Sequence, residues 1–182
     1  RGEYCGPLRN HAVMNYLLLE NGVAYAQQLS AAMWGLTRPA GDNTTKFYVG
    51  WLEHEDGRAA LQVLGEAIPY ETEEGPSVRF TESQPVHKDC DSAAFREAIA
   101  NPKLTTYEEQ EVDGETVRVP VETPLTPAVT EPEADAIQAG IEAAKGSRMS
   151  FLAVVLNSPS LSPKLKTKAD LEADGWFPEP EE

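Results

Sequence analysis

Basic residues are scarce in this chain of 182 residues, and so are histidine and cysteine. Fifteen lysines and arginines stand against 30 aspartates and glutamates, so the formal net charge is −15. A chain with that charge repels phosphate groups unless a local basic patch outweighs the rest. We therefore expect neither nucleic acid nor an anionic membrane among its partners.

Long apolar runs and phosphate-binding loops are missing too. The apolar stretch at 149–156 is far shorter than the roughly 20 residues that a membrane-spanning helix needs. Neither G-x-G-x-x-G nor G-x-x-x-x-G-K-S/T occurs, so nucleotide binding lacks its usual backbone donors. We expect a soluble protein without a cofactor, in a virion or in the cytoplasm. Because residue 1 is arginine, a leader removed before it stays an open alternative.

The two cysteines, Cys5 and Cys90, lie far apart, and neither has the C-x-x-C spacing of a metal ligand. We interpret them as reduced structural thiols, with one disulfide between them as the alternative. His87, Asp89, Cys90 and Asp91 are all ligand types, but neighbours in a loop rarely aim at one ion. Asp91 also has a sufficient role as a helix cap. We predict no metal site.

The pattern of apolar residues predicts an α+β fold. A helical stripe over 6–20, closed by Asn21-Gly22, predicts a first helix, and 23–34 predicts a second. Asn21-Gly22 also fits a hairpin turn, so a strand followed by a helix is the alternative opening. Apolar alternation over 46–64 predicts a hairpin at the centre of a small mixed or antiparallel sheet.

Further elements follow along the chain. Residues 68–80 predict an extended segment with a second strand at its end. The eight residues 149–156 predict a buried strand in the sheet of the central hairpin. Caps at Asp91, at Thr130-x-x-Glu133 and at Thr167 mark three helices, over 92–100, 131–145 and 167–173. Three or four short helices therefore pack the sheet.

Residues 104–133 hold eight acidic residues and one base, Arg118. Asp113-Gly114 predicts a second hairpin there, with an apolar row at Val117, Val119 and Val121. The segment has too few apolar side chains to pack a core of its own. We predict a protruding acidic hairpin followed by a proline-rich extended segment, both held in place by neighbouring subunits.

These elements divide a single domain into four parts. Residues 1–103 form its N-terminal part, and 104–130 form the acidic hairpin with the proline-rich segment. The helix and strand over 131–157 complete the same domain, and 158–182 form an extended tail with a short helix.

Candidate interface residues fall into a basic run, an acidic row and an aromatic pair: Lys164, Lys166, Lys168; Glu108, Glu109, Glu111; Trp176, Phe177. The basic run complements the acidic row, so opposite patches on neighbouring copies would attract each other. The alternatives are that the lysines are simply solvated and that the aromatic pair packs on its own domain.

Cys5-Gly6-Pro7 runs into the predicted first helix and resembles the start of some papain-like peptidases, a likeness that covers about residues 3–35. The resemblance implies a cysteine hydrolase with Cys5 as nucleophile, for which His87 would be the base. The chain departs from the family pattern, because no glutamine precedes Cys5 and no histidine opens a predicted strand.

The function that we favour from the sequence is a non-catalytic structural or assembly protein. It would be a subunit of a larger particle, such as a viral capsid, a decoration layer or a minor virion component, that contacts other subunits and its own copies through extended arms. One alternative is the cysteine hydrolase. A further alternative is a monomeric acidic module that binds a basic protein partner.

Overall fold

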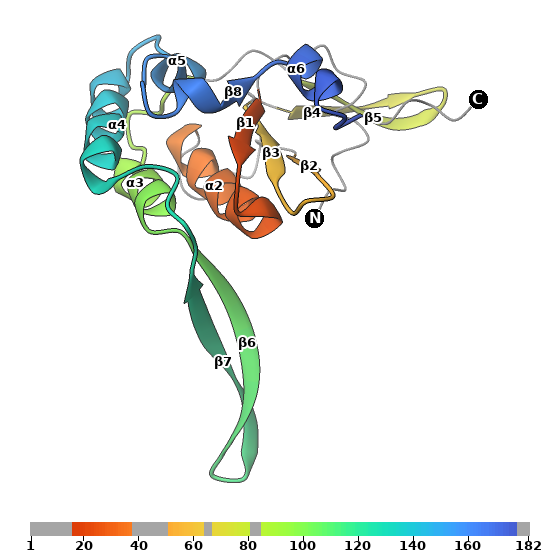
Figure 1. Ribbon diagram of the computed structural model, residues 1–182, viewed down its shortest axis with the longest axis vertical. Coiled ribbons are helices and arrows are strands. Elements are labelled where there is room, and N and C mark those ends of the chain that lie inside the picture. The colour runs from red at the N-terminus through yellow and green to blue at the C-terminus, as the bar shows by residue number, and fades with distance from the viewer. Residues whose placement is uncertain (1–15, 38–50, 64–66, 81–84, 178–182) are drawn as a thin grey trace.

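A four-stranded antiparallel sheet lies at the centre of the computed structural model, which describes residues 16–37, 51–63, 67–80 and 85–177. Its strand order is β2 (Trp51–Glu53), β3 (Ala59–Gln62), β1 (Tyr16–Leu19), β8 (Leu165–Lys166). Two separate hairpins add β4 (Ala67–Thr72) with β5 (Gly75–Phe80), and β6 (Lys103–Val112) with β7 (Glu115–Pro124). Together with the helices, these sheets confirm the α+β class (Figure 1).

The described part of the chain begins with a strand, and a helix follows it. The first helix expected over 6–20 is therefore wrong at 16–19, where β1 pairs with β3 on one side and with β8 on the other, and 6–15 lie outside the described residues. Four consecutive apolar residues suit a central strand that is covered on both faces. The alternative opening, a strand followed by a helix, is the one present.

Helix α2 (Gly22–Thr37) covers one face of the sheet and confirms the helix expected over 23–34. Its buried side chains Tyr25, Leu29, Met33 and Leu36 recur at helical spacing and pack with those of β1 and β3. Gly22 is required at the start because its φ is 67°, and a Cβ there would lie 2.3 Å from the carbonyl oxygen of Gly57. That close approach fixes the end of the helix on the β2–β3 turn.

The first hairpin is confirmed within its described part, with Trp51 opposite Leu61 and Leu52 opposite Ala60. Strand β3 is inside the sheet and β2 is at its edge. The other face of the sheet is covered by α6 (Lys168–Ala173) and the residues after it, through Leu171 and Trp176. The hairpin is thus covered on both sides, as its two-sided apolar pattern predicts.

The strand expected over 149–156 is wrong, because the segment forms the helix α5 (Phe151–Leu156). The Ser150 hydroxyl caps it by accepting a hydrogen bond from the Ala153 N–H at 3.2 Å. Phe151, Val154 and Val155 are buried at positions i, i+3 and i+4, so the same residues satisfy helical periodicity. A short apolar run is compatible with a helix and with a strand, and here the Ser150 cap favours the helix. Strand β8 occupies the edge beside β1 instead.

The three helices marked by caps are confirmed as α3 (Ser92–Ala100), α4 (Glu131–Ala144) and α6. The Asp91 carboxylate accepts from the Ala94 N–H at 3.2 Å, and Thr167 Oγ1 accepts from the Asp170 N–H at 3.2 Å. The Glu133 carboxylate accepts from the Thr130 N–H at 2.7 Å. Each cap satisfies backbone groups that the end of a helix leaves unpaired.

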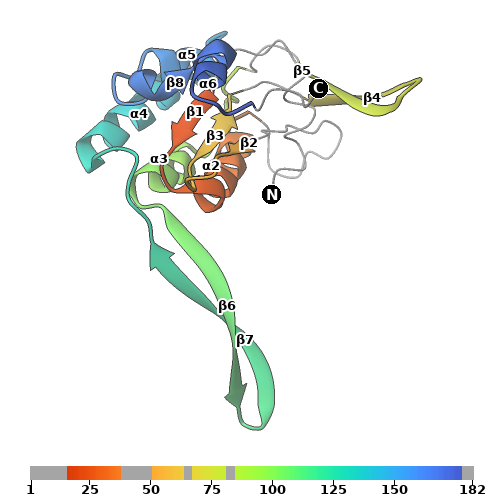
Figure 2. The same cartoon turned by 45° about the vertical axis from the view of Figure 1, so that its right-hand side comes forward.

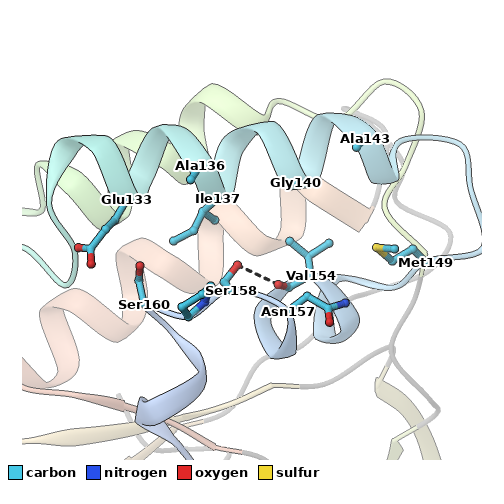
Figure 3. A pocket seen from close by; sticks show the side chains of 11 residues that line it. Glu133, Ala136, Ile137, Gly140, Ala143, Met149, Val154, Asn157, Ser158 and Ser160 are labelled. Carbon is cyan, nitrogen blue, oxygen red and sulfur yellow. Dashed lines mark hydrogen bonds between the residues drawn. The ribbon is translucent and has the colours of Figure 1, made fainter.

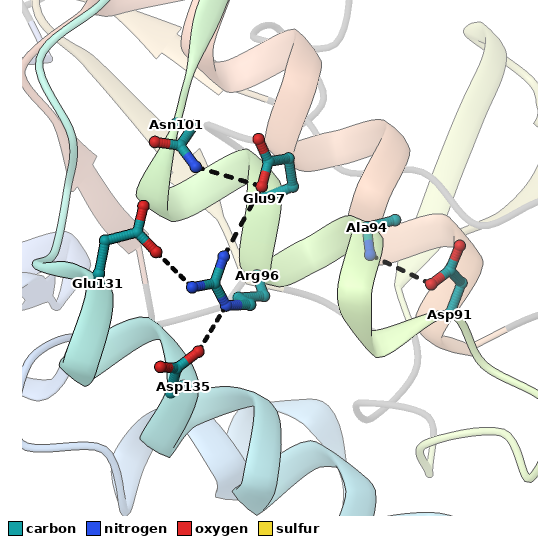
Figure 4. Close-up of polar contacts among 7 residues, drawn as sticks. All are labelled: Asp91, Ala94, Arg96, Glu97, Asn101, Glu131 and Asp135. Carbon is teal, nitrogen blue, oxygen red and sulfur yellow. Dashed lines mark hydrogen bonds and ion pairs between the residues drawn. The ribbon is translucent and has the colours of Figure 1, made fainter.

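Helices α3 and α4 pack against each other over a shared apolar core. Phe95 of α3 contacts Phe151 of α5 edge to face, with ring centroids 5.2 Å apart. At the rim, the guanidinium of Arg96 lies among carboxylates of α4: its Nε is 2.7 Å from Asp135 Oδ1, and Nη2 donates to Glu131 (Figure 4). Arg96 therefore ties α3 to α4 on the solvent side of their contact.

Two of the buried polar atoms without a hydrogen-bond partner in the described part of the chain belong to one core side chain, Gln62. Gln62 is fully buried, and neither its Nε2 nor its Oε1 has a hydrogen-bond partner in the described part of the chain. Its cross-strand neighbour Tyr16 is also fully buried, and burial raises the pKa of this tyrosine to about 12. An unpaired buried amide costs the free energy of removing it from water.

We expect the substitution Gln62→Met to raise the free energy of unfolding by about 1 kcal/mol, because it removes a desolvated amide at nearly constant volume. Urea unfolding followed by circular dichroism measures the change. Gln28→Met is the matched control and is expected to lower the stability, because Gln28 Oε1 accepts from the Lys103 N–H at 3.1 Å. A Gln62→Met protein less stable than the unmodified one would show that the amide is hydrogen-bonded.

The helix caps also predict a pH dependence. Hydrogen bonds from the Thr130 N–H and hydroxyl lower the pKa of Glu133, and those from Thr167 lower the pKa of Asp170. A carboxyl with a lowered folded-state pKa stabilises the protein above its unfolded pKa, and loses that contribution as the pH falls through the folded value. We expect the melting temperature to fall between about pH 5 and pH 2. Glu133→Gln should flatten that fall, whereas an unchanged pH profile in this variant would contradict the assignment.

Candidate protein-interaction site

Strands β6 and β7 form a long hairpin, here called the arm (residues 103–124), that projects from the rest of the molecule (Figures 1 and 2). The two strands pair in register along their whole length. Every strand residue is exposed except Val119 and Val121, which are half-buried. Asp113 and Gly114 join the strands with φ values of 52° and 84°, as a type I′ turn requires. The expected acidic hairpin is thus present and protrudes.

Hydrogen bonds fix the base of the arm to the domain. The Lys103 N–H donates to Gln28 of α2, and the Leu125 N–H donates to the Pro102 carbonyl at 2.9 Å. The chain enters the arm from α3 and leaves it toward α4, so these two packed helices set where the arm starts.

The proline-rich segment after the arm packs on its own domain. Val129 is buried in the main core, and Leu125 and Ala128 pack against that core. The Asn21 side-chain amide donates to the Thr126 carbonyl at 2.5 Å. Within the described part of the chain, a few apolar side chains and hydrogen bonds thus anchor this segment, and contact with neighbouring subunits stays a prediction for it. The same contact stays a prediction for the arm itself.

The register gives the arm two different faces, because directly opposite residues share a face and successive residues alternate. We call one the valine face, and it contains Leu104, Thr106, Glu108, Gln110, Val112, Glu115, Val117, Val119, Val121 and Thr123. We call the other the ion-pair face, and it contains Lys103, Thr105, Tyr107, Glu109, Glu111, Thr116, Arg118, Pro120, Glu122 and Pro124. The sequence predicts the valine row of β7, but Leu104 and Val112 join it only through the register.

The charges of the arm are unevenly divided between these faces. Both of its bases lie on the ion-pair face: Lys103 Nζ is 2.8 Å from a Glu122 carboxylate oxygen, and the Arg118 guanidinium lies 5.3 Å from the Tyr107 ring centre. On the valine face, Glu108 and Glu115 form no ion pair within the described part of the chain. That face therefore combines exposed apolar side chains with uncompensated negative charge.

The predicted acidic row does not form one surface. Glu109 and Glu111 lie on the ion-pair face, where Glu109 is opposite Arg118, and Glu108 lies on the valine face. A strand alternates its side chains, so three nearby glutamates divide between two faces. The three have in common that they lie on β6.

Sequence reasoning missed three exposed apolar or aromatic side chains of the arm. Leu104, Tyr107 and Val112 are exposed by 37%, 59% and 48%. The position of the turn fixes the register, and the register places each of these residues on a face. The turn is therefore the signal that could have found them.

The lysines of the basic run are partly engaged by their own domain. Lys164 is half-buried, its Nζ donates to the Ala128 carbonyl, and burial lowers its pKa. Lys166 is half-buried in β8 opposite Tyr16. Lys168 is half-buried as well, and its Nζ is 3.7 Å from a Glu172 carboxylate oxygen. An interface role for these lysines stays a prediction.

The aromatic pair packs on its own domain. Trp176 is 5% exposed and lies in a cluster with Tyr16, Leu52 and Leu171, and Phe177 is half-buried against the same cluster. Packing on their own domain is the alternative that the sequence left open for these two residues. A role for Trp176 and Phe177 in an interface stays a prediction.

The alternative hydrolase site stays a prediction, because its nucleophile is not among the described residues. Cys5 lies outside the described residues, and His87 Nδ1 accepts from the Asp89 N–H at 3.1 Å. Cys90 is a free, buried thiol, and burial raises its pKa, which favours the unreactive thiol form. Within the described ranges, no group of three His, Cys, Asp or Glu side chains is placed to hold a metal ion.

A groove lies between α4 and α5, with a volume of about 340 Å³ (Figure 3). It is lined by Ala136, Ile137, Gly140 and Val154, among others, and Glu133 is the one ionisable side chain among its lining residues. That carboxylate already accepts the hydrogen bonds of the α4 cap. The groove therefore has no pair of groups for acid–base catalysis.

Comparisons with known proteins add no relative: no family model matches the chain, and neither does any curated protein or solved structure. Among the helices that the structure describes, none has the length and apolar character needed to cross a membrane.

The exposure of the arm predicts a low local stability. A two-stranded hairpin without a covering layer is marginally stable in water, whereas β3 and α4 are part of the core. We expect backbone amides at 105–121 to exchange with deuterium at least about 100-fold faster than those of Leu61 and Ile141. Hydrogen exchange followed by NMR measures the ratio. Equal protection would show that the arm is stabilised within its own chain.

Proposed function

We propose that this protein is a non-catalytic assembly subunit that binds a neighbouring protein through its arm. The observation that carries the proposal is a hairpin of two ten-residue strands that exposes Leu104, Val112 and Val117 to solvent. Exposed apolar rows and free strand edges favour association, and natural proteins cover or protect them. Because the arm extends away from its own domain, we infer that a binding partner covers these exposed groups.

The setting that we propose is a multi-subunit particle, of which a virion shell is one example. Extended arms suit such particles because they reach past one neighbour and add contact area without enlarging the core. The domain supplies a firm base for the arm, through the hydrogen bonds of Lys103, Leu125 and Asn21. These contacts support an arm that is presented in a defined direction.

An armless variant tests the proposal. Replacing residues 105–122 by Asn-Gly retains the two strand pairs nearest the domain and closes them with a type I′ turn. We expect the melting temperature to change by less than about 4 °C, because the arm lies outside the core. In the source organism, the armless protein should no longer co-sediment with the large complex that contains the full chain.

The control for that experiment is Thr105→Ser, which leaves the arm in place and should co-sediment as the full chain does. If the armless protein folds normally and still enters the complex to the same extent, the arm has no part in assembly and the proposal fails.

A further inference from the structure

The two outer edges of the arm are not equivalent. In a two-residue hairpin the residue before the turn accepts a hydrogen bond from the residue after it, so Val112 and Glu115 form a hydrogen-bonded pair. Hydrogen-bonded and non-hydrogen-bonded pairs then alternate along the strands. The non-hydrogen-bonded pairs are those of the ion-pair face, and their backbone N–H and C=O groups point outward, away from the partner strand.

The outer edge of β7 is interrupted by proline. Pro120 and Pro124 both occupy outward-pointing positions, where a proline removes an N–H that an added strand would need. The outer edge of β6 has no proline, and beyond Lys103 its outward positions are Thr105, Tyr107, Glu109 and Glu111. Strand addition is therefore open on β6 and obstructed on β7.

At the base of the arm, an outward-pointing backbone group of β6 already forms a hydrogen bond. Lys103 is the first outward position of β6, and its N–H donates to Gln28 Oε1 of α2 at 3.1 Å. Beyond it, a hollow of about 330 Å³ is lined by Gln27, Gln28, Leu104 and Thr105, among others. The free edge of β6 begins at this hollow and continues to the turn.

The side chains beside the free edge are acidic. Glu108 lies on one face of β6, and Glu109 and Glu111 lie on the other, so a strand added to this edge meets carboxylates on both of its faces. Arg118, which is opposite Glu109, lies on β7 and not at this edge. A strand with lysine or arginine at the matching positions gains opposite-charge pairs across the strands.

A second copy of this chain is a poor occupant of the edge. Pairing β6 with β6 of another copy would place two sets of these glutamates side by side, and like charges across strands are destabilising. Each copy has a formal net charge of −15, which adds a long-range repulsion. The chain's own basic run is half-buried in its domain.

We propose that the free edge of β6 receives, by strand addition, a lysine- or arginine-rich extended segment of a different protein. The proposal rests on the proposed function and names the chemistry of the partner. Backbone hydrogen bonds to the edge supply part of the affinity, and the glutamates select a cationic segment.

The test uses the full chain labelled with ¹⁵N and two synthetic octapeptides, one alternating valine with lysine and one alternating valine with glutamate. We expect only the lysine peptide to shift NMR signals, with the largest shifts at amides 105–111. The triple variant Glu108→Gln, Glu109→Gln, Glu111→Gln should weaken its binding at least about tenfold. The matched control Glu71→Gln, Glu73→Gln, Glu74→Gln makes the same change of charge on the β4–β5 hairpin and should leave binding within about twofold.

Two further variants separate strand addition from simple charge attraction. Tyr107→Pro removes one outward N–H, as Pro120 does on β7, and should weaken binding at least about tenfold, whereas Tyr107→Ala should not. Equal binding by both variants overturns strand addition. No binding of the lysine peptide, or self-association of the chain through β6, also overturns the proposal. In each of these cases the armless variant still reports separately whether the arm mediates assembly.

Discussion

The packing of α3 against α4 is the constraint on which the arm depends. Phe95 and Ile99 of α3, with Ile137 and Ile141 of α4, are buried in one core, and Arg96 joins the two helices at its rim. The chain passes from one helix through the arm to the other. A hairpin with no core of its own thereby starts from a fixed place, because its two ends belong to well-packed helices.

Local signals in the sequence are enough to predict several elements of the fold. Asp91, Thr130 and Thr167 each mark a helix start, because their side chains or backbone groups pair with residues a few positions away. Asp113-Gly114 predicts the arm for a similar reason, since few residue pairs adopt the dihedral angles of its turn. These predictions succeed because the deciding interactions lie within a few residues.

The errors fall where the surroundings of a short apolar run decide its structure. Residues 16–19 and 149–156 are both such runs, and their types depend on what lies beside them: β3 and β8 for the first, and the Ser150 cap for the second. The candidate site shows the same division. The acidic and valine rows are visible in the sequence, but their assignment to faces requires the pairing of β6 with β7.

The prolines of β7 also bear on how far an assembly of this kind extends. Because Pro120 and Pro124 interrupt the outer edge of β7, further strands can pair with the arm at the β6 edge and not at the β7 edge. Under the proposed strand addition, each arm therefore offers a guest segment a single edge, that of β6. Because the β7 edge is obstructed, arms cannot add to one another edge by edge into a fibre.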